Sequence, residues 1–400
     1  MKKLISSLLL VIVSQLLLAQ GRIIVWLKPG VPAEQLALTY PVTLTDFSPG
    51  APFALYTVTG GQDPHIIEAD MRAGGLVNMA EDDHEMVAPE NVGAGKGGTI
   101  GAVFDPGALF EENRQLLSQI NYRFRHLSLF DRPVRIAILD TGVPALNLYI
   151  RSRVVAGVGI ASDRTDYFDR PTGVDTNHDN EPDGALGHGS MVSGLVAQIA
   201  PFARFVIARV ADSDGVSSAW NLIKGIAFAA QNNAEVINIS FGAVEGIPAL
   251  KDVIENWLDP QGVLVVAAIG NNGSDSANSP ASYSQVICVS GVDQNNLKAP
   301  FSNWDGKARQ SAPATGVKSC WWDHTMGVWS GTSFASPLVA ATIADSLRSR
   351  PRYTTNVQLD ALRDLINATG TDIDGQNPAY RGKLGRLLNN HALQQAIIQQ

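Results

Sequence analysis

Four short stretches of the sequence carry residues whose types suit acyl-transfer chemistry. An aspartate, Asp140, ends an apolar run, and a histidine, His188, stands between two glycines at the start of a small-residue run. An asparagine, Asn271, follows a second apolar run, and a serine, Ser333, precedes a stretch with helical character. A serine nucleophile needs a base to take its proton, a carboxylate to orient that base and a donor for the oxyanion. The chain supplies one residue of each type.

Each of these signals is weak by itself. Aspartate at the end of a strand is often only a turn residue, and a single histidine is more often structural than catalytic. The Asn272-Gly273 pair beside Asn271 is a strong turn signal, and serine is a common helix N-cap. The specificity therefore lies in the set of four, because together they satisfy every requirement of nucleophilic catalysis by serine.

The elements that must position these residues follow from the hydrophobic pattern. From Val134 onward, Val- and Ile-rich strands alternate with helices, which predicts a mostly parallel sheet buried on both faces. The predicted strands are 134–139, 205–210, 236–240, 262–268 and 286–292, and the predicted helices are 188–200, 217–231, 247–258, 333–347 and 357–366. The expected fold class is α/β, a doubly wound sheet with helices on both faces, preceded by a small α+β domain. Ligands gather at the carboxyl edge of such sheets, so the four residues are expected to meet there.

The motifs around the four residues resemble those of the subtilisin-like serine proteases, the subtilases, across residues 130–395. The resemblance rests on Ile-Leu-Asp140-Thr-Gly, Gly-His188-Gly-Ser-Met-Val, Ala-Ile-Gly-Asn271 and Gly-Thr-Ser333-Phe-Ala-Ser-Pro. It implies a subtilisin-like fold in which Asp140, His188 and Ser333 form a catalytic triad. It also implies that Asn271 and the backbone N–H of Ser333 form the oxyanion hole, and that no cofactor is required.

Further stretches match elements of the same family. The resemblance implies that a strand at Ser240-Phe241-Gly242 binds the substrate and that Ala268-Ile269-Gly270 forms the facing wall. The expected function is therefore that of a serine endopeptidase, with proteins or peptides as its substrates.

The first 20 residues predict a secretory signal. Residues 1–3 include two lysines, residues 4–18 are almost wholly apolar, and Ala19 offers a small-residue cleavage point. An uncleaved membrane anchor is the alternative, but the apolar run is shorter than the roughly 20 residues that a spanning helix needs. We therefore expect a secreted or periplasmic protein with no stable membrane insertion after signal removal.

Residues 21–90 predict a small α+β domain of alternating strands and helices. The predicted strands are 22–27, 53–58 and 76–87, and the predicted helices are 32–38 and 64–72. The resemblance implies that this domain is a propeptide, which would make it a partner of its own protease as folding aid and inhibitor.

Residues 91–130 are expected to join that domain to a catalytic domain at 131–400. Five glycines among residues 91–101 predict a junction without a regular element. After it, apolar residues recur at helical spacing and predict one amphipathic helix through Phe110, Leu117, Ile120, Phe124 and Leu127.

Composition limits the remaining possibilities. The 400 residues include 30 basic and 38 acidic side chains, giving a net charge of −8 without a basic run, which argues against nucleic acid as a partner. Cys288 is expected to be a buried free thiol on a strand, and Cys320 to lie in a loop. One loop has oxygen-bearing side chains at alternate positions and resembles a calcium loop; a solvated acidic loop is the alternative. Its candidate ligands are Asp175, Asn177, Asp179 and Asp183.

Three other functions fit parts of the pattern. Asp140-Thr-Gly is also an aspartic-protease signature, but those enzymes need two such carboxylates and an all-β fold. An α/β-hydrolase esterase would use Ser333 with Asp374 and His391, which leaves His188 without a role. A catalytically silent, peptide-binding homologue would lack one of the four residues, and all four are present.

Overall fold

The computed structural model describes residues 21–87 and 97–399. The chain divides into two compact units, with the boundary between His84 and Glu85. This boundary differs from the expected one at residue 90, and it assigns the expected junction and helix at 91–130 to the larger unit. The predicted signal at residues 1–20 lies outside the described residues.

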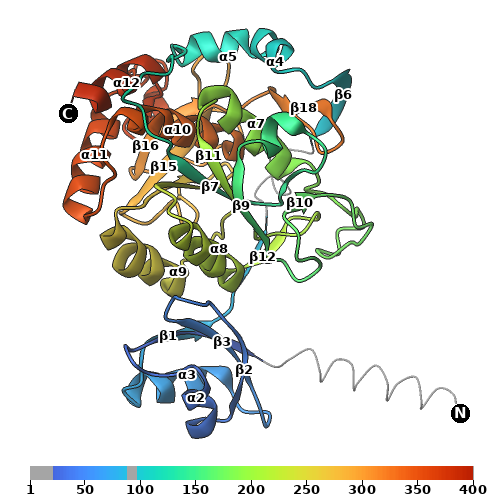
Figure 1. The fold of residues 1–400 in the computed structure, drawn as a ribbon, viewed down its shortest axis with the longest axis vertical. Helices are drawn as coiled ribbons and strands as arrows, with labels where there is room; N and C mark the ends of the chain where they lie inside the picture. Colours follow the sequence, from blue (N-terminus) through green and yellow to red (C-terminus); the bar gives the residue numbers. More distant parts are fainter. Residues whose placement is uncertain (1–20, 88–96, 400) are drawn as a thin grey trace, which may run out of the picture. The chain divides into compact units, whose positions relative to one another are not determined.

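The first unit is a four-stranded antiparallel sheet with two helices (Figure 1). Its strand order is β2-β3-β1-β4, and its apolar core includes Ile23, Val25, Tyr56, Ile67 and Met71. The elements are β1 (Arg22–Leu27), α2 (Glu34–Thr39), β2 (Val42–Phe47), β3 (Phe53–Val58), α3 (Pro64–Ala73) and β4 (Val77–Asp82). β2 was not predicted from the sequence, although its side chains alternate in burial as in a half-buried strand. Val42, Leu44 and Asp46 are less exposed than the residues that follow each of them.

The second unit is built on an eight-stranded sheet in the order β19-β16-β15-β14-β13-β7-β11-β9. All seven neighbouring pairs are parallel. The strands are β7 (Arg135–Asp140), β9 (Val154–Gly159), β11 (Arg204–Arg209), β13 (Val236–Ile239), β14 (Leu264–Ala268), β15 (Val286–Val292), β16 (Ala308–Pro313) and β19 (Arg386–Leu387). The five strands expected from apolar runs are all present, which confirms the α/β class.

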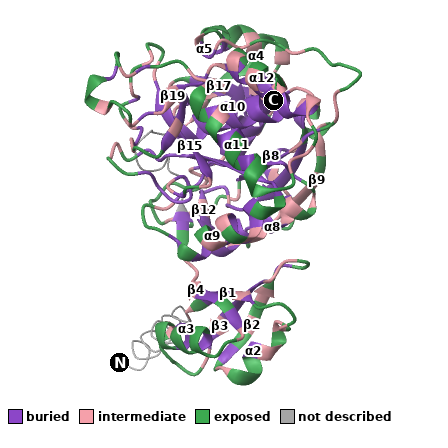
Figure 2. Ribbon diagram, turned by 90° about the vertical axis from the view of Figure 1, so that its left-hand side faces the viewer, coloured by how far each residue is buried: buried purple, intermediate pink, exposed green. Residues whose placement is uncertain are grey.

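Helices cover both faces of this sheet (Figure 1). On one face, α7 and α10 pack against the central strands, and α10 is buried along its whole length. On the other, α8 packs against β7 and β11. The helices are α7 (His188–Ile199), α8 (Ala219–Gln231), α9 (Pro248–Asp252), α10 (Thr332–Ser346), α11 (Asn356–Ala368) and α12 (Asn390–Gln399). Figure 2 shows the buried residues concentrated in the sheet and in α10.

The glycine-rich junction contains a strand, which corrects the sequence prediction. β6 (Gly98–Val103) pairs antiparallel with β18 (Thr325–Trp329), which in turn pairs with β17 (Val317–Cys320). The edge of a hairpin offers unpaired backbone N–H and C=O groups, so a segment with few side chains can still join it. Its partner lies more than 220 residues away, and local composition gives no sign of that pairing.

The single amphipathic helix expected after the junction is also wrong. The structure has two short helices, α4 (Pro106–Glu112) and α5 (Arg114–Gln119). They separate at Asn113, whose buried amide donates to Gln198 and to the carbonyl of Lys318. The chain leaves helical geometry at Asn121, which has φ +48°. Phe124 and Leu127 therefore lie beyond the helix, where they are exposed.

Both cysteines are buried and free. Cys288 lies on β15 as expected, whereas Cys320 ends β17 instead of lying in a loop. Among the described residues, no helix combines the length and the apolar character needed to cross a membrane.

Candidate active site

The aspartate and histidine singled out from the sequence form a buried pair. Asp140 ends β7 at the carboxyl edge of the sheet, and His188 begins α7. The Nδ1 atom of His188 lies 2.7 Å from Oδ1 of Asp140, and both side chains are at most 1% exposed. The same Oδ1 accepts a hydrogen bond from the backbone N–H of Thr141 at 2.8 Å. The carboxylate therefore fixes the ring through one nitrogen.

The glycines beside His188 are required by this close approach. Gly187 precedes the helix with φ +90°, a left-handed conformation that side chains disfavour. A Cβ on Gly189 would lie 2.2 Å from the carbonyl oxygen of Gly142 and 2.9 Å from Oδ1 of Asp140. In the motif Gly-His-Gly, the first glycine therefore allows the backbone conformation before the helix, and the second allows the close approach to Gly142 and Asp140.

A second buried carboxylate, which the sequence analysis missed, holds the start of the same helix. Asp169 is fully buried, and its Oδ2 accepts from Ser190 Oγ at 2.7 Å and from the N–H groups of Gly187 and Ser190. Helix N-termini have unsatisfied N–H groups that favour a negative charge. Asp169 lies 19 residues before His188 and ends a two-residue strand, β10 (Phe168–Asp169), which is too short to give a recognisable sequence pattern.

The serine-bearing helix is joined to the predicted substrate strand by reciprocal hydrogen bonds. Ser333 Oγ donates to the carbonyl of Ser240 at 3.0 Å, and Ser240 Oγ donates to the carbonyl of Ser333 at 3.0 Å. Behind them, Asn238 Nδ2 donates to Ser240 Oγ, and Ser336 Oγ donates to Asn238 Oδ1. These bonds place Ser333 and Ser240 side by side.

Three aromatic rings surround the imidazole of His188. Phe334, the neighbour of Ser333, lies 5.3 Å from it between ring centroids, and Phe241 and Trp329 each lie 5.6 Å away edge-on. The expected substrate residue Phe241 therefore contacts the histidine directly. Trp329 lies four residues before Ser333, and this short spacing is the sequence signal for its place beside the histidine.

Asn271 is fixed against the first residue of α10. Its Oδ1 accepts from both the N–H and the Oγ1 of Thr332, each at 2.9 Å. Gly270 has φ +114°, and a Cβ there would lie 2.5 Å from Asn303 Nδ2. The two bonds from Thr332 therefore fix the orientation of the Asn271 side-chain amide.

The other predicted substrate-binding residues lie in the same region. Ala268 ends β14, and it and Ile269 are at most 3% exposed. Gly242 follows Phe241, and a Cβ there would lie 2.8 Å from the carbonyl oxygen of Ser279, in the segment that pairs with Ala243.

The chain on both sides of residues 88–96 pairs with strands near the histidine. β5 (Glu85–Val87) pairs antiparallel with β12 (Val216–Ser218). Ser217 of β12 donates to the carbonyl of Val210, whose N–H donates to the carbonyl of Asp140. On the other side, a Cβ on Gly97 would lie 2.2 Å from the ring of Trp329. Two segments of this chain therefore occupy strand edges that flank the site.

This geometry suits acyl transfer. It combines a serine hydroxyl at the start of a helix with an imidazole held by a carboxylate and with an amide donor on a neighbouring strand end.

The comparisons with known proteins agree. The profile of the Subtilase family matches residues 131–385, which is more than half of the chain.

The chain belongs to the subtilase family. It is 34% identical over 266 residues to the thermostable alkaline protease of Halalkalibacterium halodurans, covering 64% of this chain and 67% of that protein. It is 33% identical to thermitase of Thermoactinomyces vulgaris, covering 59% and 83%, and 31% identical to subtilisin E of Bacillus subtilis, covering 62% and 63%.

A solved structure is similar as well. The crystal structure of a cold adapted subtilisin-like serine proteinase matches with a TM-score of 0.57 and 27% identity, covering 69% of this chain and 97% of that one. The subtilisin-like α/β fold is thus confirmed, and the subtilase is a serine endopeptidase, a hydrolase.

The residues of the esterase alternative lie in a different setting. His391 is exposed near the start of α12, whereas Ser333 is buried. Asp374 accepts a hydrogen bond from the N–H of Gly382 at 3.0 Å. Asp140 and His188, in contrast, form a buried carboxylate–histidine pair in this subtilase.

The buried Asp169 gives a pH dependence that can be measured. Burial raises the pKa of Asp169 to about 6, against the opposing hydrogen bonds from Ser190 and Gly187. The unfolded chain loses this proton near pH 3.9, whereas the folded chain keeps it to about pH 6. The stability that this group contributes is therefore complete below about pH 4 and is lost as the pH rises to about 6.

We expect the Asp169→Asn variant to lose this pH dependence. Thermal melts would be recorded at pH 4 and pH 6.5 in a Ser333→Ala background, which prevents self-digestion. As the pH rises from 4 to 6.5, the parent should lose stability that the variant does not lose. The change in melting temperature should therefore be more negative for the parent than for the variant. Equal changes in both proteins would contradict a proton held by Asp169.

Proposed function

We propose that this subtilase is exported and hydrolyses peptide bonds in proteins through an acyl-enzyme formed on Ser333. The observation that carries the proposal is the buried 2.7 Å contact between His188 Nδ1 and Asp140 Oδ1. The ring of His188 also packs against Phe334, which is the neighbour of Ser333. The predicted signal at residues 1–20 supports export, since a basic start and a short apolar run are typical of secretory signals.

Acylation begins with proton transfer from Ser333 Oγ to Nε2 of His188 as Oγ bonds to the substrate carbonyl carbon. Asp140 binds the Nδ1–H, so it holds the tautomer with a basic Nε2 and stabilises the imidazolium that forms. His188 then gives the proton to the leaving amine nitrogen, and the C–N bond breaks. Water then gives a proton to His188 and bonds to the acyl carbon. The C–Oγ bond breaks, His188 returns the proton to Ser333 Oγ, and the acid product leaves.

The negative charge on the substrate oxygen requires donors that are already oriented. We assign this role to Asn271 Nδ2 and the backbone N–H of Ser333. Thr332 supports the assignment because its two bonds to Asn271 Oδ1 fix the amide in one orientation before substrate arrives. Removing one donor of this kind costs roughly 100- to 1,000-fold in turnover in related chemistry.

We further propose that the substrate binds as an extended strand along residues 240–242 and 216–218, facing the wall at 268–270. The pairing of β5 with β12 supports this, because a segment of the chain itself already adds to that edge as an extra strand. Residues 21–90 would then act as a propeptide, whose last strand blocks the position that a substrate takes.

The triad assignment predicts a specific pattern of activity loss. Ser333→Ala should lower turnover of a peptide substrate by about 10⁴-fold or more. His188→Ala should lose a similar amount, and the double variant little more, because the two act as one unit. The measurement is steady-state kinetics on propeptide-free enzyme.

His391→Ala is the matched control for the loss of a histidine. It should keep full activity, since His391 is exposed at α12. A dead His391→Ala with an active His188→Ala would replace this mechanism by that of the esterase alternative.

The propeptide assignment predicts self-cleavage between β5 and β6. Wild type should cut itself after Val87 and before Gly98, and Ser333→Ala should accumulate uncut from about Gly21 onward. Intact-mass measurement and N-terminal sequencing would locate the new end. Separately made residues 21–90 should inhibit the mature enzyme and speed its refolding. An active enzyme that keeps its N-terminus near Gly21, with no effect of the added fragment, would make this domain a permanent accessory.

We also propose that the loop at residues 175–183 binds a structural calcium ion. Asp175 and Asn177 both accept from the N–H of Asp179, and Asp179 accepts from Glu181, so the oxygens gather in one turn. Asp183 is bound instead by the N–H groups of Thr172 and Gly173 and by Ser213.

If calcium binds there, excess EGTA should lower the melting temperature, and added calcium should restore it. The variant Asp179→Asn should respond less to both. An unchanged melt in chelator, together with no calcium by elemental analysis, would remove the proposal.

A further inference from the structure

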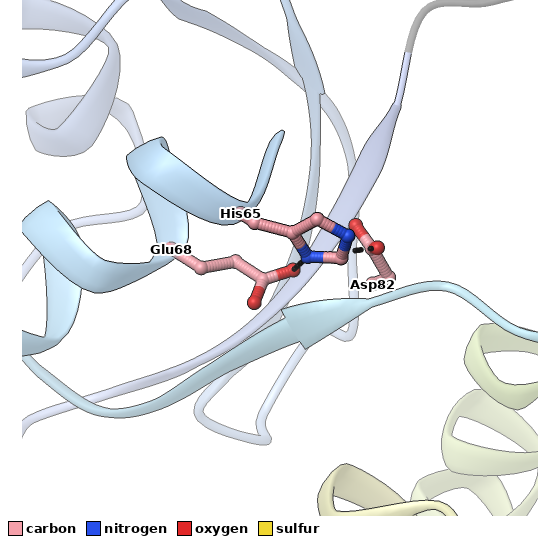
Figure 3. Close-up of side chains that lie close together, drawn as sticks. All are labelled: His65, Glu68 and Asp82. Atoms are coloured by element: carbon pink, nitrogen blue, oxygen red, sulfur yellow. Dashed lines mark ion pairs between the residues drawn. The ribbon is translucent and has the colours of Figure 1, made fainter. Parts of the chain in front are cut away.

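Three side chains in the first unit meet at a point that the protease function does not use. His65 and Glu68 lie three residues apart on one face of α3, and Asp82 ends β4 (Figure 3). Each has a ligand atom within 4.8 Å of the other two. Among the described residues, this is the one group of at least three histidine, cysteine or acidic side chains with that property.

The distances fit ligands around one ion. His65 Nδ1 lies 3.9 Å from Glu68 Oε1 and 3.5 Å from Asp82 Oδ2. Nitrogen and oxygen ligands placed about 2.1 Å from a tetrahedral zinc ion are about 3.4 Å apart. The two separations from His65 are therefore within about 0.5 Å of this value, and the ligand atoms of Glu68 and Asp82 lie within 4.8 Å of each other.

A second observation points independently to a missing ligand. Glu68 is only 6% exposed, and its Oε1 has no hydrogen-bond partner among the described residues. A buried carboxylate oxygen without a partner is costly, because its lost hydration is not replaced. This oxygen faces the imidazole of His65 (Figure 3), on the side where an ion would sit.

The surrounding groups hold the three side chains in place. Arg72 lies 3.5 Å from the other oxygen of Glu68 and donates to the carbonyl of Ala80, so it orients this carboxylate. Asp63 caps the helix by accepting from the N–H of His65, which fixes the backbone of that residue.

The charges in the cluster favour a cation. His65 lies within 4 Å of two carboxylates, those of Glu68 and Asp82. Glu68 is paired with one arginine, Arg72, at 3.5 Å, so a cation at this point would meet negative charge that is only partly compensated. The side chain of His65 is 74% exposed, which leaves an open path for an ion and room for water ligands.

We propose that His65, Glu68 and Asp82 bind a divalent transition-metal ion of the zinc type. One imidazole nitrogen with two carboxylate oxygens is a donor set that suits zinc, whereas calcium requires six to eight oxygen ligands. A bound ion ties the first turn of α3 to the last residue of β4 and so stabilises the first unit.

The test uses the full chain carrying Ser333→Ala, so that both units stay in one uncut polypeptide. After removal of metals with a chelator and desalting, zinc chloride is titrated in by calorimetry. We expect one zinc ion per chain at this site. His65→Ala and Glu68→Gln should each weaken it by at least roughly tenfold, because losing a ligand costs more than losing a supporting contact. Circular dichroism checks that each variant is folded.

His84→Ala is the matched control, because His84 also lies in the first unit 3.4 Å from a single carboxylate, that of Glu81. It should bind zinc as the parent does. Zinc should also raise the melting temperature of the parent but not of His65→Ala. The proposal is overturned if His65→Ala binds zinc as tightly as the parent, if His84→Ala weakens binding equally, or if calcium at similar concentration displaces the zinc.

Discussion

The contact between His188 and Asp140 is the constraint on which the catalytic unit is built. Both side chains are withdrawn from water, and a buried charged group is tolerated only when it is paired and hydrogen-bonded. To bring them together, the end of β7 must lie beside the start of α7, so that His188 Nδ1 is 2.7 Å from Asp140 Oδ1. That requirement explains the absence of a side chain at Gly189 and the acidic residue, Asp169, that holds the N–H groups of the helix start.

Packing of α10 in the protein core positions Ser333. α10 is buried throughout, so the place of its first turn is set by core packing and not by a flexible loop. The reciprocal bonds between Ser333 and Ser240 then couple the helix to the strand that precedes Phe241. A single rigid arrangement thereby fixes Ser333, the proposed nucleophile, relative to the strand along which a substrate is proposed to lie.

Much of this could be predicted from sequence because the determinants are local. Continuous apolar runs predicted the central strands, and the short motifs around Asp140, His188, Asn271 and Ser333 predicted the subtilase family. The catalytic roles of these four residues stay predictions. Apart from β2, whose alternating pattern is local, two features that were missed depend on distant partners. β6 is a strand only because the edge of β18 accepts it, and Asp169 matters only because α7 begins beside it. Pairing with a distant hairpin edge and bonding to buried N–H groups produce no recognisable pattern in the neighbouring sequence.

Two of the histidine–carboxylate groups in the described residues, one around His188 and one around His65, show how burial decides what such residues can do. In the second unit the imidazole is enclosed by three rings and one carboxylate, so one nitrogen is fixed and the charge it can carry is matched by one neighbour. In the first unit the imidazole is mostly exposed and faces two carboxylates, so negative charge is in excess and a path to solvent is open. A matched, closed pair suits the movement of a proton. An unmatched, open group suits the capture of a cation.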